Sequence, residues 1–131
     1  MNPNILSRLG AISMAVFLAI PSAFAASPVT CKVPFAFQVA TKTLPPGEYK
    51  FQVDANRQSV MVMASGKNAD AMALVVTELA ASSHAEATHA RIVFDKAGNT
   101  YTLSEIWQPG FDGILVATTK EKHEHHVIHI K

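Results

Sequence analysis

Turn-forming residues recur along most of this chain, and the runs between them are rich in β-branched and aromatic residues. The turn clusters are Leu44–Gly47, Asp54–Arg57, Ser65–Asn68, Asp95–Asn99 and Gln108–Gly113. Within the runs, apolar residues alternate with a period of two, and no long stretch follows the period of an amphipathic helix. The sequence therefore predicts an all-β fold, either a single antiparallel sandwich or a small barrel-like domain.

The clearest predicted element is a β-hairpin in the second half of the chain. Its two strands are predicted over Arg91–Phe94 and Thr100–Trp107, on either side of a Gly-containing connection. In that connection, Gly98 and Asn99 can supply the positive φ values that a hairpin loop needs.

Simple alternation in the second strand assigns its residues to two faces. Tyr101, Leu103 and Trp107 fall on one face, with Ser104 and Ile106 on the other. Because Trp107 is the only tryptophan and shares a face with Leu103, we expect it to anchor the core.

The remaining strands are predicted from the same alternation. They are Val29–Ala40, Glu48–Val53, Ser59–Ala64, Asp70–Glu78 and Ile114–Thr119. Pro34 cannot donate a backbone hydrogen bond, so the first of these strands is predicted to lie at an edge or to contain a bulge. The run Ser59–Ala64 is apolar on both faces, which predicts a central or covered strand. We interpret Leu79–His89 as a loop with at most one helical turn.

The N-terminus has the three regions of a secretory signal peptide. A short basic segment ending at Arg8 precedes the apolar run Leu9–Ile20, and a small-x-small pattern ends at Ala25. The apolar run is too short to span a membrane, which takes about 20 residues. We therefore predict cleavage after Ala25, with Ala26 as the alternative, and export to the periplasm or beyond.

The rest of the chain divides into a β domain over residues 26–119 and a histidine-rich C-terminal tail over residues 120–131. The chain has 11 Lys and Arg against 10 Asp and Glu, and loss of Arg8 with the signal peptide removes the excess. Binding to nucleic acid requires a basic excess, as does capture by an anionic membrane. We expect neither a nucleic-acid partner nor stable membrane insertion after cleavage.

The tail is the strongest candidate for a binding site. It contains His123, His125, His126 and His129, and neutral imidazole is a good ligand for Zn, Cu and Ni. In a strand, His123, His125 and His129 would project to one side. A defined site would need a further ligand from elsewhere in the chain, which the sequence does not identify. The alternative, which we favour at this point, is a solvated terminus, although Val127 could also support a short edge strand.

Sulfur-containing side chains also invite a functional interpretation. Met61, Met63 and Met72 carry thioethers, which suit Cu(I), but methionines at a period of two in a strand more often fill gaps in a core. We expect the core role. Cys31 is the only cysteine, so no disulfide can form within the chain, and its place in a strand predicts burial.

No catalytic pattern stands out. Ser82, Ser83 and His84 are adjacent in sequence, but an activated serine needs a base and an orienting acid brought together in space. The chain has no nucleophile-elbow or phosphate-loop motif. We therefore expect neither an enzyme nor a cofactor.

Two stretches resemble an uncharacterised family of small exported bacterial proteins. In that family a VPFxF strand leads to LPAGEY, and an A-[RK]-[IL]-V-F strand leads through a Gly-containing turn to YxLSE[IV]W. The matching residues are Val33, Pro34, Phe35, Phe37, Leu44, Pro45, Gly47, Glu48, Tyr49, Arg91–Phe94, Tyr101 and Leu103–Trp107. Pro46 and Asp95 depart from that pattern, as does the histidine-rich tail. The resemblance implies an exported all-β domain and brings no activity, ligand or catalytic residue.

Three functions are therefore open. The first is a non-catalytic exported β domain that acts as a binding or structural module, with an unknown protein or small molecule as its partner. The second is a metal-binding accessory protein that uses the tail histidines. The third is a small enzyme of unknown type.

Overall fold

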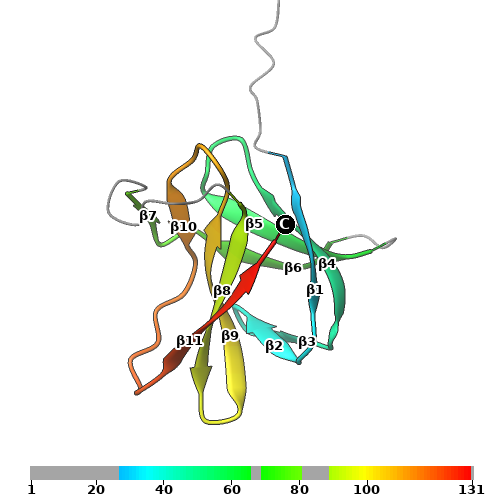
Figure 1. Cartoon of the computed structure of the whole chain (residues 1–131), viewed down its shortest axis with the longest axis vertical. Coiled ribbons are helices and arrows are strands. Elements are labelled where there is room, and N and C mark those ends of the chain that lie inside the picture. Colours follow the sequence, from blue (N-terminus) through cyan, green and yellow to red (C-terminus); the bar gives the residue numbers. More distant parts are fainter. Residues whose placement is uncertain (1–26, 66–68, 81–88, 131) are drawn as a thin grey trace, which may run out of the picture.

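The computed structural model describes residues 27–65, 69–80 and 89–130, and these form two β-sheets (Figure 1). The predicted all-β class is confirmed, and the two sheets form a sandwich-like domain. The predicted signal peptide lies outside the described residues, as does most of the predicted loop Leu79–His89.

Sheet A is antiparallel, with the strand order β1-β4-β5-β6. Its strands are β1 (Val29–Val33), β4 (Gly47–Val53), β5 (Ser59–Ala64) and β6 (Ala69–Leu74). Sheet B has the order β11-β8-β9-β10-β7, and β2 joins it by pairing with β3 and with β9. Its strands are β2 (Phe37–Val39), β3 (Lys42–Leu44), β7 (Thr77–Leu79), β8 (Arg91–Ala97), β9 (Thr100–Trp107), β10 (Gly113–Leu115) and β11 (Glu124–His129).

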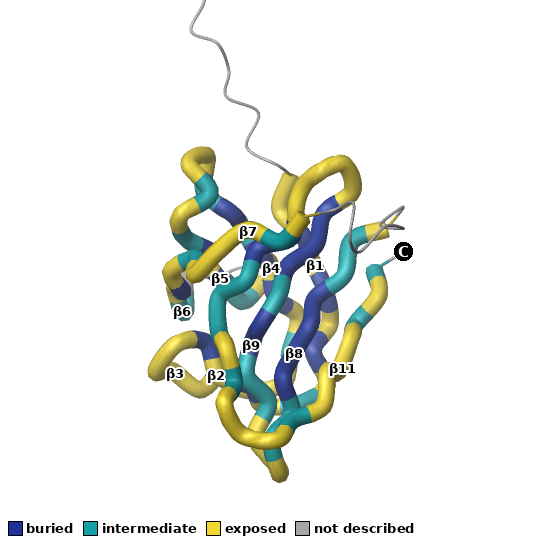
Figure 2. Tube along the Cα trace, turned by 90° about the vertical axis from the view of Figure 1, so that its left-hand side faces the viewer, coloured by how far each residue is buried: buried dark blue, intermediate teal, exposed yellow. Residues whose placement is uncertain are grey.

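The hydrophobic core lies between the two sheets. Alternation in the strands directs large apolar side chains inward from both of them. The largest fully buried members of this core are Phe37, Phe51, Ile92, Phe94, Leu103, Ile106 and Ile114. In Figure 2, buried segments are prominent along β8 and β9, whereas β3 and β11 are largely exposed.

Two of the predicted strands are each divided between the sheets. The run Val29–Ala40 breaks at Pro34, which has no backbone N–H, so β1 belongs to sheet A and β2 to sheet B. The run Asp70–Glu78 divides after β6. There the Val75 N–H donates to the Gln58 carbonyl beside sheet A, and the Val76 N–H donates to the Leu115 carbonyl in sheet B, both at 2.8 Å. These crossings make the chain a sandwich, and period-two alternation alone does not reveal them.

The predicted hairpin is confirmed, and its loop is shorter than expected. Strand β8 extends to Ala97, which pairs with Thr100, so only Gly98 and Asn99 form the loop. Gly98 has a φ of 60°, and it alone of the two has a positive φ. A glycine in this position is typical of the tight turns that suit the twist of a hairpin.

A β-bulge at Ser104 changes the face that the end of β9 presents. The register shifts there by one residue, and the Ser104 hydroxyl donates to the Ala117 carbonyl at 3.2 Å. Leu103 and Ile106 therefore both face the core, and Trp107 turns to the outward face of sheet B. The expected burial of Trp107 is confirmed, but its predicted place on the Leu103 face is wrong.

Trp107 is buried outside the main core. Its side chain is only 1% exposed, and the Arg91 guanidinium lies 4.6 Å from the ring centroid. A Cβ atom added at Gly113 would lie 2.6 Å from the indole, so only glycine fits beneath it without rearrangement. The end of sheet B thus has a second, smaller packing layer on its outward side.

The C-terminal tail is part of sheet B. Strand β11 pairs antiparallel with β8 along its whole length, from Glu124 opposite Lys96 to His129 opposite Arg91. Ile130 also packs against the core, although most side chains of β11 are exposed. The prediction of a solvated terminus is therefore wrong for this segment, because the edge-strand alternative applies.

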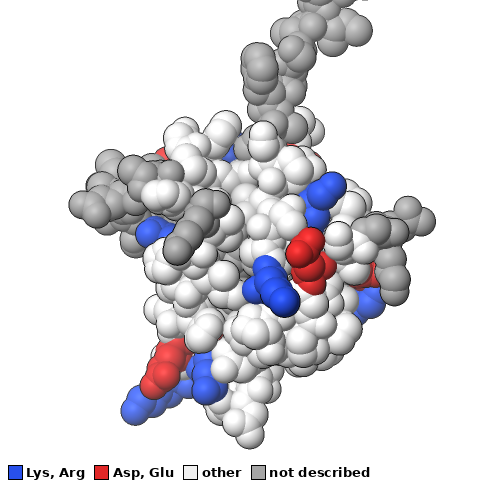
Figure 3. Space-filling view, turned by 45° about the vertical axis from the view of Figure 1, so that its right-hand side comes forward, with Lys and Arg blue, Asp and Glu red and all other residues white. Residues whose placement is uncertain are grey.

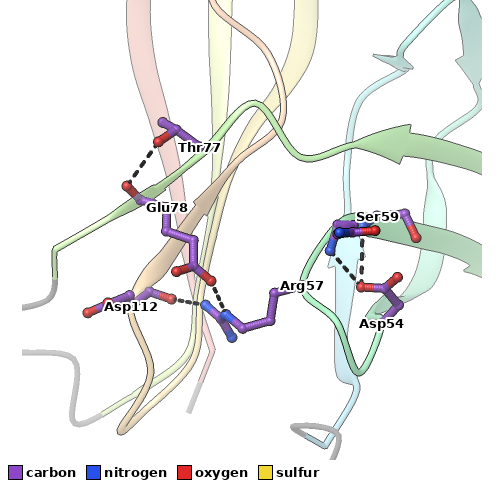
Figure 4. Close-up of polar contacts among 7 residues, drawn as sticks. Asp54, Arg57, Ser59, Thr77, Glu78 and Asp112 are labelled. Carbon is purple, nitrogen blue, oxygen red and sulfur yellow. Dashed lines mark hydrogen bonds and ion pairs between the residues drawn. The ribbon is translucent and has the colours of Figure 1, made fainter.

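Arg57 joins the ends of the two sheets (Figure 4). It lies in the turn between β4 and β5 with a φ of 56°, and its Nε pairs with the Glu78 carboxylate of β7. Its Nη2 donates to the Asp112 carbonyl at 2.7 Å, and its guanidinium lies 5.6 Å from the centroid of the Phe111 ring. The turn itself is held by Asp54, whose Oδ1 accepts from the Gln58 backbone N–H at 2.7 Å.

Surface charge follows the balanced composition. On the side where β1 and β4 come forward, the few basic and acidic side chains lie in small mixed groups on a mostly uncharged surface (Figure 3). Among the described residues, no helix is long and apolar enough to cross a membrane.

Candidate metal centre

Asp95 is an acidic residue buried on the outward face of sheet B. It lies in β8 between Thr102 of β9 and His125 of β11, and its side chain is 2% exposed. A carboxylate removed from water in this way is stable only with a cation or with hydrogen-bond donors around it. Asp95 therefore defines the polar centre of this face.

Two tail histidines meet the Asp95 carboxylate. The His125 Nδ1 atom lies 2.9 Å from Asp95 Oδ1, and the His123 Nε2 atom lies 3.8 Å from the same oxygen. One ligand atom from each of the three residues lies within 4.8 Å of the other two. A tetrahedral ion with donor bonds of about 2.1 Å holds its donors roughly 3.4 Å apart, so small side-chain rotations would bring these three into a common coordination sphere.

The His123 ring is held in a defined orientation by the main chain. Its Nδ1 atom lies 2.8 Å from the Glu121 carbonyl oxygen. Because a carbonyl only accepts hydrogen bonds, Nδ1 must carry the proton, and the lone pair of the neutral ring is then on Nε2. That lone pair is on the nitrogen nearest Asp95. A backbone carbonyl that fixes a histidine in this way is typical of the groups that support metal ligands.

His125 is the more exposed ligand of the pair. Its side chain is 60% exposed, and its ring centroid lies 5.1 Å from that of His123. Without a metal, an Nδ1–H of His125 donates to Asp95, and a metal ion would replace that proton. Exposure leaves the ring free to adjust to the ion.

One side of the centre opens to a hollow of about 280 Å³. It is lined by Lys96, Gly98, Lys122, His123 and Glu124. Glu124 alternates to the face of β11 opposite His125, so a fourth ligand would come from solvent.

The other two predicted ligands lie elsewhere. His126 turns to the opposite side of β11, where its ring lies 5.2 Å from Phe35 and 5.7 Å from Tyr101. His129 shares the face of His125 but pairs with Arg91, four residues further along the strand, which is about 13 Å away. The structure thus brings together two of the four predicted histidines.

Sequence reasoning missed Asp95, which it assigned to the hairpin turn. The signal that could have found it is an acidic residue continuing a run of apolar strand residues, Ile92–Phe94. Its link to His125 depends on a pairing between positions 30 residues apart, which local patterns do not encode.

Cys31 does not contribute to a metal site. Its burial, as predicted, is confirmed, and burial raises the pKa of the thiol to about 11. The thiolate needed for ligation or nucleophilic attack is therefore scarce near neutral pH. The adjacent Ser82, Ser83 and His84 lie outside the described residues.

No family model, curated protein or solved structure matches this chain.

Proposed function

We propose that this protein is a non-catalytic exported β domain that binds one divalent transition-metal ion, Zn, Cu or Ni, through Asp95, His123 and His125. The observation that carries the proposal is the meeting of a buried carboxylate with two imidazole nitrogens from the C-terminal tail, one in β11 and one just before it. A carboxylate and two imidazoles are a donor set that suits these borderline metals.

The arrangement can accommodate a cation between Asp95 and His123. The Glu121 carbonyl requires a proton on Nδ1 of His123, so the neutral ring presents a lone pair towards the carboxylate. Two acceptors that face each other repel unless a proton or a metal ion lies between them. An ordinary Asp–His hydrogen bond would need only His125, and the second ring is what favours a metal ion.

Export is supported by the three-part N-terminus and by the resemblance to small exported proteins. We expect protein recovered from an exporting host to begin at Ala26 or Ser27. N-terminal sequencing that finds Met1 retained would contradict export and would leave the metal proposal unaffected.

The metal proposal is tested by titrating the full chain with Zn²⁺, Cu²⁺ and Ni²⁺ in a calorimeter. We expect one equivalent to bind, and Asp95→Asn and His123→Ala each to weaken binding at least 10-fold, as loss of a ligand or of its support does elsewhere. The matched control is the double variant His126→Ala/His129→Ala, which keeps β11 but removes histidines outside the centre. If that control weakens binding as much as Asp95→Asn does, the tail chelates metal without a preformed site, and the proposal is wrong.

A further inference from the structure

Three of the five methionines in this chain gather on the outward face of sheet A. Met61 and Met63 lie in β5 and Met72 in β6, whereas the other two precede the described residues. Val60 and Val62 are fully buried, so alternation turns Met61 and Met63 away from the core.

These methionines do not fill gaps in the core. Met61 is 37% exposed and Met72 is 57% exposed, while Met63 is partly buried. The expected core role is therefore wrong for Met61 and Met72. The neighbouring Leu74 is exposed as well, so this face of sheet A is open to solvent, and the methionines are the side chains on it that can ligate a metal ion.

The strand register places the three methionines next to one another on this face, although a β-bulge shifts the pairing between Val62 and Met63. Met61 and Met72 are direct partners in the β5–β6 pair, and Met63 is the next residue on the same face of β5. Direct cross-strand partners have Cβ atoms about 5 Å apart, and diagonal neighbours about 7–8 Å apart. Methionine has three rotatable side-chain bonds, enough to close these gaps around a single ion.

We propose that Met61, Met72 and Met63 form a binding site for a soft monovalent metal ion, Cu(I). Thioether sulfur prefers Cu(I) over the borderline divalent ions that suit the Asp95 centre. Cys31, the competing soft ligand, is buried with a raised pKa, and the histidines of β11 belong to the other sheet. This site is separate from the proposed divalent centre and does not depend on it.

The charge and polarity of the neighbouring residues indicate which of the three methionines would bind the ion most strongly. On β4, the neutral Gln52 lies opposite Met61, whereas Lys50 lies opposite Met63 and disfavours a cation there. The exposed Leu74 follows Met72 on the same face of β6 and offers an apolar shield. Met61 and Met72 are therefore the principal ligands, and Met63 completes the set.

The first test uses Ag⁺, a redox-inert analogue of Cu(I), added to the full chain labelled with ¹³C at the methionine methyl groups. One equivalent should shift the NMR signals of Met61 and Met72 strongly and that of Met63 less, with no shift at Met1 or Met14. If these three signals do not move, the proposal is wrong.

The second test measures Cu(I) affinity by competition with bicinchoninate under anaerobic conditions. Met61→Leu/Met72→Leu keeps size and apolarity at exposed positions and should weaken binding at least 10-fold. The control variant Asp95→Asn/His123→Ala should bind Cu(I) as the unmodified chain does, even though it loses divalent ions. Unchanged Cu(I) affinity in the leucine variant, or its loss in the control, would overturn the methionine site.

Discussion

The outward faces of the two sheets differ in what covers them. On sheet B, Trp107 and Asp95 point outward, yet both are buried: Arg91 lies over the indole, and His123 and His125 lie against the carboxylate. On sheet A, Met72 and Leu74 point outward and are 57% and 69% exposed.

The two outward faces differ because different segments of the chain lie beside them. Both sheets bury their inward faces in the same core, but in sheet B the edge strand β11 pairs beside β8, and tail side chains lie against the outward Asp95. Where neighbouring side chains exclude water, a polar group needs partners, and the Asp95 carboxylate has the imidazoles of His123 and His125. Where the face stays open, the side chains remain available to ligands from solution.

The largest test of this contrast is Trp107→Ala compared with Met72→Ala. Removing a buried aromatic side chain costs about 3–5 kcal/mol of folding free energy, because it leaves a cavity. The exposed Met72 should cost less than about 1 kcal/mol. Urea unfolding of both variants measures the difference, and similar losses would mean that the outward face of sheet B is not a packed layer.

Deletion of residues 123–131 removes the edge strand β11 of sheet B. We expect a loss of about 2 kcal/mol in metal-free protein, from the partly buried Ile128 and Ile130, and a melting temperature lower by about 10 °C. The double variant His126→Ala/His129→Ala retains these isoleucines and should melt within a few degrees of the unmodified chain. An unchanged melting temperature after the deletion would show that β11 contributes nothing to the fold in solution.

Arg57→Ala tests the contacts that join the ends of the two sheets, which lie away from both outward faces. We expect a loss of about 1 kcal/mol, since exposed ion pairs contribute little and the Asp112 and Phe111 contacts add to it. Arg57→Gly should be less destabilising than Arg57→Ala, because glycine accepts the φ of 56° without strain. Chemical denaturation that ranks the two variants in the opposite order would contradict this account of the turn.

The smallest expected effect is the pH dependence of stability that comes from Asp54, in the turn that carries Arg57. The hydrogen bond from the Gln58 backbone N–H, with a second from Ser59, holds the pKa of Asp54 below its usual range. A carboxyl whose pKa is lower in the folded state stabilises the fold above the unfolded pKa, about 3.9, and loses that contribution as pH falls through the folded pKa. Asp54→Asn should therefore lower the melting temperature slightly at pH 7, and the gap from the unmodified chain should shrink below about pH 4. A gap that does not change with pH would mean that the charge of Asp54 is unimportant.

The sequence predicted those features that depend on neighbouring residues. Period-two alternation and turn chemistry predicted the all-β class, the hairpin around Gly98 and the burial of Cys31. These follow from where Cβ atoms point along a strand and from which residues accept a positive φ.

The tertiary structure alone decided which face and which sheet each segment joined. One extra residue at Ser104 turned Trp107 outward, and the crossing after Pro34 sent one alternating run into two sheets. The meeting of Asp95 with His125 rests on a strand pairing between residues 30 positions apart. Such pairings are set by the packing of the whole domain, and a shift of one residue in register would put every side chain of β11 on the other face, so the local sequence cannot determine them.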